Sequence, residues 1–193
     1  MNIKEHRQHV TDELTSCNLT AQSLFVLLCA ERLRNCCWAY QASSGVSFEV
    51  YFEWSDILFE MLLNPDLRRS NLVPSAIQDL EAILPTGGEP LFVQGQSAII
   101  CLLSALEICS NGHRLSVSDS VNAIIDAIDN YDFFIRRRLK NDNSSPANYT
   151  LLQREVGRQL SDVAFVKMQD RLNRVELIEY RYENLQFAVP IAV

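Results

Sequence analysis

Apolar residues recur at intervals of three and four positions along most of the chain, which is the spacing of amphipathic helices. In the first part of the chain, this pattern predicts a short polar helix over residues 4–16, a second helix over 20–42 and a third over 47–63. Two serines and Gly45 separate the second from the third. Asn64-Pro65 ends the third, because the residue before a proline avoids the helical region.

The rest of the chain predicts four more helical segments. A short helix follows Pro74 and is stopped by Pro85, and an apolar helix over 90–111 ends at Asn111-Gly112. A helix over 118–140 comes next, and a long helical pattern then runs over 146–185 after a polar linker at 141–145.

The last pattern carries an apolar stripe that we expect to be buried. It is followed by an apolar tail over 186–193, which we expect to be extended and to pack on the body or on a partner. The stripe consists of Val156, Leu160, Val163, Leu172, Val175, Ile178, Tyr182 and Leu185.

The length and composition fit one globular domain. The chain has 193 residues, of which 48% are hydrophobic, and it contains only six glycines and six prolines. The segment after the polar linker is too short for a core of its own. We therefore predict an all-α fold, a single irregular bundle of about six or seven helices over residues 1–193.

The charge balance narrows the classes of partner. The net charge is −7, which repels a phosphate backbone and an anionic lipid surface, so we expect no nucleic-acid binding and no membrane binding. The polar N-terminus has no secretory signal pattern, and the longest nearly uncharged apolar stretch, 97–106, is shorter than a membrane span of about 20 residues. Both features favour a cytoplasmic protein.

The six cysteines are expected to be reduced thiols. None is in a Cys-x-x-Cys pair, and the spacing does not suit zinc. Most of them lie in apolar helical patterns, where a cysteine acts as a small hydrophobe.

Acidic residues on the third predicted helix suggest one possible site. Glu49, Glu53, Asp56 and Glu60 follow one another at spacings of four, three and four, so they share one side of the helix. They form either a solvated stripe or a carboxylate face for a divalent cation. A cation would require further oxygen ligands from another segment.

Glu31 is the acid whose position is hardest to explain as surface. It falls among Leu24, Leu27 and Leu28 on the helical wheel, where an ionised carboxylate requires a partner. One interpretation is a structural ion pair with an arginine such as Arg32, Arg34 or one from another helix. The other is a carboxylate whose pKa is raised by burial and which serves in a cleft.

Motifs that carry known chemistry are missing from the sequence. It has three histidines, no Glu-x-x-His pair, no phosphate-binding loop, no dinucleotide fingerprint and no nucleophile elbow. We therefore expect no cofactor and no metal centre, and the balance is against an enzyme.

The order of several short motifs resembles the YjaG-like bacterial proteins, domain-of-unknown-function family 416. The resemblance implies an all-α cytosolic bacterial protein and supplies no activity. It also implies that Glu31, Arg32, Asp56 and Glu60 occupy recurring polar positions. The chain departs from the Pro-Asn-Tyr expected after Glu31-Arg32, where Asn35, Cys36 and Cys37 stand instead. The motifs are Cys29 with Glu31-Arg32, Ser55-Asp56-Ile57-Leu58-Phe59-Glu60, Leu80-Glu81 with Pro85, and Leu106-Glu107.

Two functional hypotheses follow. The first is a non-enzymatic helical protein that acts as a homo-oligomer, such as a two-fold dimer, or through a protein partner. The alternative is a hydrolase or ligand-binding protein with an acidic pocket, with or without a divalent cation. The alternative predicts that Glu31, Asp56 and Glu60 converge with Arg32 beside them.

Overall fold

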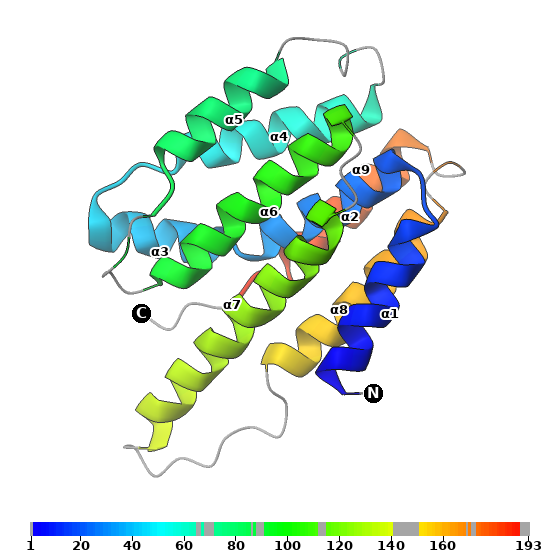
Figure 1. Cartoon of the computed structure of the whole chain (residues 1–193). Helices are drawn as coiled ribbons and strands as arrows, with labels where there is room; N and C mark the ends of the chain where they lie inside the picture. The colour runs from blue at the N-terminus through cyan, green and yellow to red at the C-terminus, as the bar shows by residue number, and fades with distance from the viewer. Residues whose placement is uncertain are drawn as a thin grey trace.

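Helices are the only extended regular structure among the residues that the computed structural model describes. Those residues are 2–64, 67, 72–85, 87, 91–111, 115–140, 151–168, 170 and 173–189, without the side chains of 111, 115, 116 and 132–140. They contain nine helices and no strand, so the all-α prediction is confirmed and the count of six or seven is wrong (Figure 1). The helices are α1 (Ile3–Thr15), α2 (Leu19–Arg32), α3 (Arg34–Ser44), α4 (Glu49–Leu63), α5 (Leu72–Ala82), α6 (Phe92–Asn111), α7 (Leu115–Lys140), α8 (Leu151–Val166) and α9 (Arg174–Leu185).

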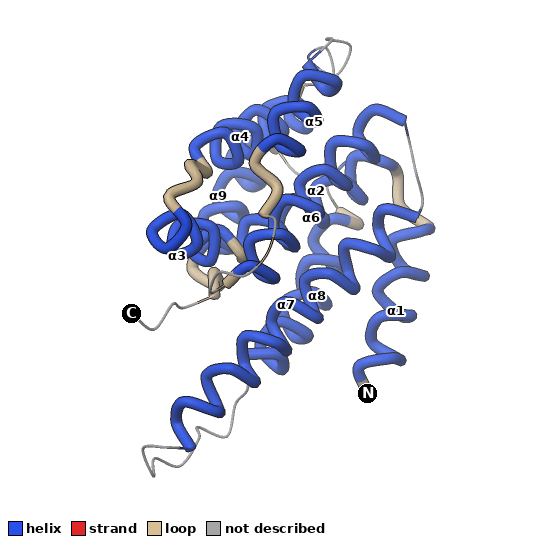
Figure 2. The backbone as a smooth tube through the Cα atoms, turned by 60° about the vertical axis from the view of Figure 1, so that its left-hand side comes forward, coloured by secondary structure: helices blue, strands red, loops and turns tan. Residues whose placement is uncertain are grey.

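Helix α2 lies at the centre of the molecule. All of its residues from Ala21 to Arg32 are buried, because α4, α6, α7, α8 and α9 all pack against it. Helices α3, α4 and α5 lie together on one side, whereas α1, α7 and α8 lie on the other (Figure 2). A helix that is buried on every side must find partners for its polar groups inside the protein. Both polar clusters described below therefore start from α2.

The expected helix over 20–42 is broken at Leu33, which is one source of the larger helix count. The N–H of Cys36 bonds to the carbonyl of Leu33 at 2.9 Å, instead of to the carbonyl of Arg32. The Arg32 carbonyl accepts from the backbone N–H of Val189 at 2.8 Å. The backbone of Val189 thus binds the carbonyl that would accept the next hydrogen bond of the helix, and the chain bends at Leu33.

The expected long helix over 146–185 is also divided, with α8 ending at Val166 and α9 beginning at Arg174. Asn173 accepts the N–H groups of Val175 and Glu176, and the Glu176 carboxylate accepts the N–H of Asn173 in return. This capping box satisfies donors that a helix start leaves free, so a new helix begins there.

The stripe expected to be buried in this region is wrong in large part. Val163 is buried, but Leu160 is 36% exposed, Val175 60% and Tyr182 68%. Leu172 lies outside the described residues. Helix α8 instead buries a polar face made of Glu155, Arg158, Gln159 and Asp162. The prediction from hydrophobicity chose the wrong face of α8, because the polar groups on the buried face are paired inside the protein.

The described part of the tail packs on the body of the protein. Phe187 is half-buried, while Ala188 and Val189 are buried. Asn35 donates to the carbonyl of Val189 at 3.2 Å, and Arg154 donates to the carbonyl of Phe187 at the same distance. The linker at 141–145 and residues 190–193 lie outside the described residues.

Helix α6 is long and strongly apolar. Its segment Phe92–Ser110 has a mean hydropathy of 1.6 and is long and apolar enough to cross a membrane, yet 61% of it is buried inside the protein. Buried core helices of globular proteins have the same properties.

Candidate functional site

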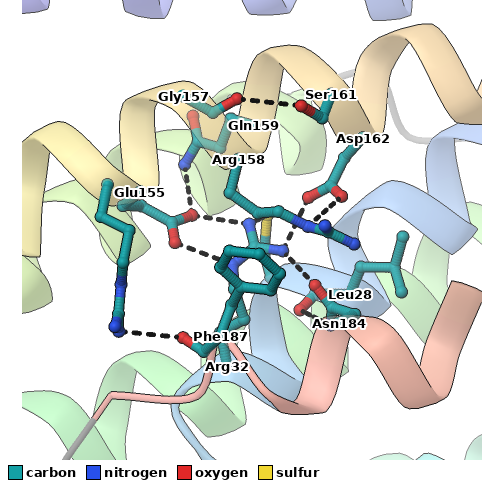
Figure 3. A network of polar contacts seen from close by, with 12 residues as sticks. Leu28, Arg32, Glu155, Gly157, Arg158, Gln159, Ser161, Asp162, Asn184 and Phe187 are labelled. Atoms are coloured by element: carbon teal, nitrogen blue, oxygen red, sulfur yellow. Dashed lines mark hydrogen bonds and ion pairs between the residues drawn. The ribbon is translucent and has the colours of Figure 1, made fainter.

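The strongest polar cluster surrounds Arg32 at the C-terminal end of α2. The guanidinium donates to both carboxylate oxygens of Glu155, at 2.7 and 2.6 Å, and to Asp162 at 2.6 Å (Figure 3). It also donates to the side-chain oxygen of Asn184 at 2.7 Å and to the sulfur of Cys29 at 3.3 Å. All five N–H donors of Arg32 are therefore used.

This cluster joins three helices that are far apart in the sequence. Arg32 comes from α2, Glu155 and Asp162 from α8, and Asn184 from α9. The side-chain amide of Asn184 also donates to the backbone carbonyl of Leu28 at 3.0 Å, which fixes α9 on α2 a second time. The cluster thus acts as an internal clamp between α2, α8 and α9.

The charges of the clamp are removed from water. Arg32, Asp162 and Asn184 have no exposed surface, and Glu155 is 4% exposed. Burial lowers the pKa of the Arg32 guanidinium, but Glu155 and Asp162 outweigh that effect and raise the pKa above its usual value. Arg32 therefore stays protonated. Breaking such a pair leaves a buried charge alone, so each member depends on the others.

The network extends on both sides of the clamp. Gln159 donates to Glu155 at 3.0 Å, and its amide oxygen lies 2.8 Å from Nε2 of His6 on α1. On the other side, the Tyr180 hydroxyl donates to Asp162 at 2.9 Å. Arg158 lies 3.1 Å from Asp162, and its guanidinium carbon lies 4.6 Å from the ring centre of Tyr180. Helix α1 is thus linked to the clamp as well.

Glu31, next to Arg32 in sequence, belongs to a separate cluster. Successive helix residues point about 100° apart, so Glu31 faces α4 and α9 while Arg32 faces α8. Its Oε1 accepts the Ser55 hydroxyl at 3.0 Å and two N–H donors of Arg181, one of them at 2.7 Å. Glu31 is 2% exposed, and its Oε2 has no hydrogen-bond partner in the described part of the chain.

Arg181 also connects Glu31 to the acidic side of α4. Its Nη2 donates to Asp56 at 2.6 Å, and its guanidinium carbon lies 4.5 Å from the ring centre of Phe59. Burial lowers the pKa of Arg181, but Glu31 and Asp56 outweigh that effect and raise the pKa. One cation therefore serves two carboxylates.

The four residues singled out from the sequence fall in three places. Glu31 and Asp56 meet at Arg181, and Arg32 is part of the clamp. Glu60 lies on the surface of α4, where its two oxygens accept from Arg174 at 2.9 and 2.8 Å. Asp56 and Glu60 thus both pair with arginines of α9. These contacts do not bring the four candidate residues into one pocket.

The partners of these residues were missed by sequence reasoning. Glu155, Gln159 and Asp162 lie four and three residues apart, so they share a face of α8. That polar stripe is visible in the sequence, but an exposed stripe looks the same. Arg181 gives no signal beyond its place on a helical pattern.

The buried cysteines have the properties of unreactive thiols. Every cysteine is free, and four of the six are buried. Burial raises the pKa of Cys36 and of Cys101 to about 12, so both stay protonated thiols. No group of three or more histidine, cysteine or acidic residues within the described ranges is arranged to hold a metal ion.

Comparisons with known proteins add no relative. No family model, no curated protein and no solved structure matches the chain. The resemblance to the YjaG-like proteins stays a prediction that rests on the order of short motifs.

Proposed function

We propose that this chain is a non-enzymatic cytosolic protein that acts by self-association or by binding a protein partner. The observation that carries the proposal is that Glu31 and Arg32, the two buried residues among the polar candidates from the sequence, are already bound by side chains of the protein. Both are engaged by side chains of other helices, and Arg32 has no donor left for a ligand. Their interactions support a role in holding α2, α4, α8 and α9 together.

Exposed apolar side chains support the same proposal. Trp38 on α3 is 47% exposed, and Val175 and Tyr182 on α9 are 60% and 68% exposed. Val175 and Tyr182 are seven residues apart, so they share a face of α9. Aromatic side chains on a surface favour contacts with another protein.

Sedimentation over a wide concentration range tests self-association. If the chain pairs through α9, its mean mass rises above the monomer mass of 22.0 kDa, and the variant with both Val175→Ser and Tyr182→Ser returns to that mass. A monomer at every concentration would remove self-association and leave only the protein partner.

One observation favours the alternative, a ligand-binding or hydrolytic acidic pocket with a divalent cation. Glu31 and Asp56 come from two helices and meet at Arg181, and Oε2 of Glu31 lacks a described donor. Calorimetry with magnesium, manganese and nucleotides distinguishes the two. Heat that Glu31→Gln abolishes, while the melting temperature of that variant is kept, would support the pocket and contradict our proposal.

A further inference from the structure

The side of the molecule formed by α3, α4 and α5 carries a concentrated negative charge. These three helices contain six acidic residues and one basic residue, Arg34, and neither α4 nor α5 contains a lysine or an arginine. Both views place the three helices together, away from α1, α7 and α8 (Figures 1 and 2). These three helices therefore carry more negative than positive charge, although Arg174 and Arg181 of α9 pair with Glu60 and Asp56.

A fixed aromatic pair lies on this side. The ring of Trp38 stacks on the ring of Phe52, with centres 4.4 Å apart and planes 18° apart. Phe52 in turn makes an edge contact at 5.3 Å with Tyr51, which is buried. Trp38 is nevertheless 47% exposed, so it offers a held ring to the surroundings. A rigid aromatic group loses little entropy when it binds.

Carboxylates flank the aromatic pair. Glu49 and Asp56 lie three residues before and four residues after Phe52, so they are on its face of α4, and Glu53 follows Phe52 directly. Glu49 and Glu53 are exposed, and among the described residues neither makes an ion pair. The guanidinium carbon of Arg34 lies 5.2 Å from the ring centre of Phe52, so the aromatic pair already contacts one cation of the chain itself. Asp56 shares Arg181 with the buried Glu31, so this pair of acids keeps an excess of negative charge.

The geometry points to a docking surface for a basic protein, centred on Trp38 with Phe52, Glu49, Glu53 and Asp56. This inference rests on the proposed function and names the class of partner. A lysine or arginine of the partner stacks on the Trp38 ring by a cation–π contact, while further basic groups approach the exposed carboxylates of Glu49 and Glu53. A two-fold dimer through the same face would place acid against acid, which like-charge repulsion opposes. Nucleic acid is repelled for the same reason.

The test uses the full chain and two synthetic helical peptides with the same apolar residues, one with an arginine face and one with a glutamate face. Binding is followed by tryptophan fluorescence and calorimetry. We expect the arginine peptide alone to bind, with affinity that falls as salt rises. Trp38→Ala and the double variant Glu49→Gln, Glu53→Gln should each weaken binding at least tenfold.

The control removes the same amount of charge elsewhere. Glu179 on α9 and Asp129 on α7 are exposed acids, so Glu179→Gln with Asp129→Asn changes the net charge equally and should leave binding unchanged. Equal weakening by the control would show attraction to net charge alone and overturn the inference. So would absence of binding, or equal binding of the glutamate peptide. Self-association by sedimentation in that case would keep the proposed function while this surface is rejected.

Discussion

At the scale of single residues, Arg32 shows why a buried charge is informative. It is a fully buried arginine whose five donors all have acceptors, supplied by α2, α8 and α9. An intact buried ion pair gains little net free energy, because both charges must be desolvated. By contrast, the loss of one partner leaves the other buried charge unpaired and destabilises the protein.

We predict that Arg32→Met lowers the free energy of unfolding by about 3–5 kcal/mol, because Glu155 and Asp162 are left buried without a cation. Urea unfolding measures this. The matched control is Arg174→Met, which removes the exposed pair with Glu60 and should change stability by about 1 kcal/mol or less. Equal effects of the two variants would refute the clamp.

His6 provides a prediction on pH. Burial lowers the pKa of His6 from 6.5, its hydrogen bond to Gln159 and the charge of Glu155 oppose the change, and His9 and Arg7 add to it. Because Gln159 donates its N–H to Glu155, its oxygen faces His6, so Nε2 of the neutral ring carries the proton. A second proton on Nδ1 would find no described acceptor.

The unfolded chain therefore binds a proton on His6 at a higher pH than the folded chain does. Stability from His6 is full above pH 6.5 and is lost as the pH falls below it. We expect this decline in urea unfolding at two pH values on either side of 6.5, and His6→Gln should flatten it. The exposed His9 is the control, and an equally flat profile for His9→Gln would contradict the assignment.

At the scale of helices, the ends of α9 and of α2 show what a sequence reveals. The capping box of Asn173 with Glu176 is a local pattern, and a search for it would have divided the long helix. The break at Leu33 has no local signal, because its cause is the backbone N–H of Val189 at the far end of the chain. The break between α3 and α4 was predictable from the sequence, because it lies at Gly45. This residue adopts a φ of 74°, which glycine tolerates better than other residues do.

The same distinction applies to the polar clusters. Glu31 was recognisable as a buried acid because its neighbours on α2 are leucines. Its actual partner, Arg181, comes from another helix, and no spacing rule connects the two. The local sequence pattern thus identified Glu31 as a buried acid. Its partner, Arg181, could be identified only from the packing of α9.

We predict that Asn173→Ala lowers the free energy of unfolding by about 1 kcal/mol, because it removes the side-chain cap of α9. Chemical denaturation with circular dichroism measures the change. Asn173→Asp keeps the acceptor and should lose much less. If both variants were equally destabilised, the cap would not be what starts α9.

At the scale of the whole molecule, the packing of the core determines which thiols react. Cys29, Cys36, Cys37 and Cys101 are buried, whereas Cys17 and Cys109 are partly exposed. We predict that a thiol reagent labels at most Cys17 and Cys109 in the native protein and all six cysteines in denaturant. Rapid labelling of a third thiol before unfolding would contradict the core described above.

In the molecule as a whole, buried polar contacts hold the inner helices together, whereas the acidic side chains of α4 lie on the surface. Arg32 and Glu31 hold the inner helices together, while Trp38, Glu49 and Glu53 are exposed. This arrangement supports the proposal that the protein acts through contacts at its surface.

The most direct test follows the indole N–H signals of Trp38 and Trp54 by nuclear magnetic resonance while the arginine peptide is added. Trp54 is 9% exposed and donates to Asp79 at 3.1 Å, so it serves as an internal reference on the same side of the molecule. We predict that the Trp38 signal shifts in a saturable way while the Trp54 signal stays in place. An unchanged Trp38 signal, or a shift of both signals caused by magnesium and nucleotide instead, would contradict it.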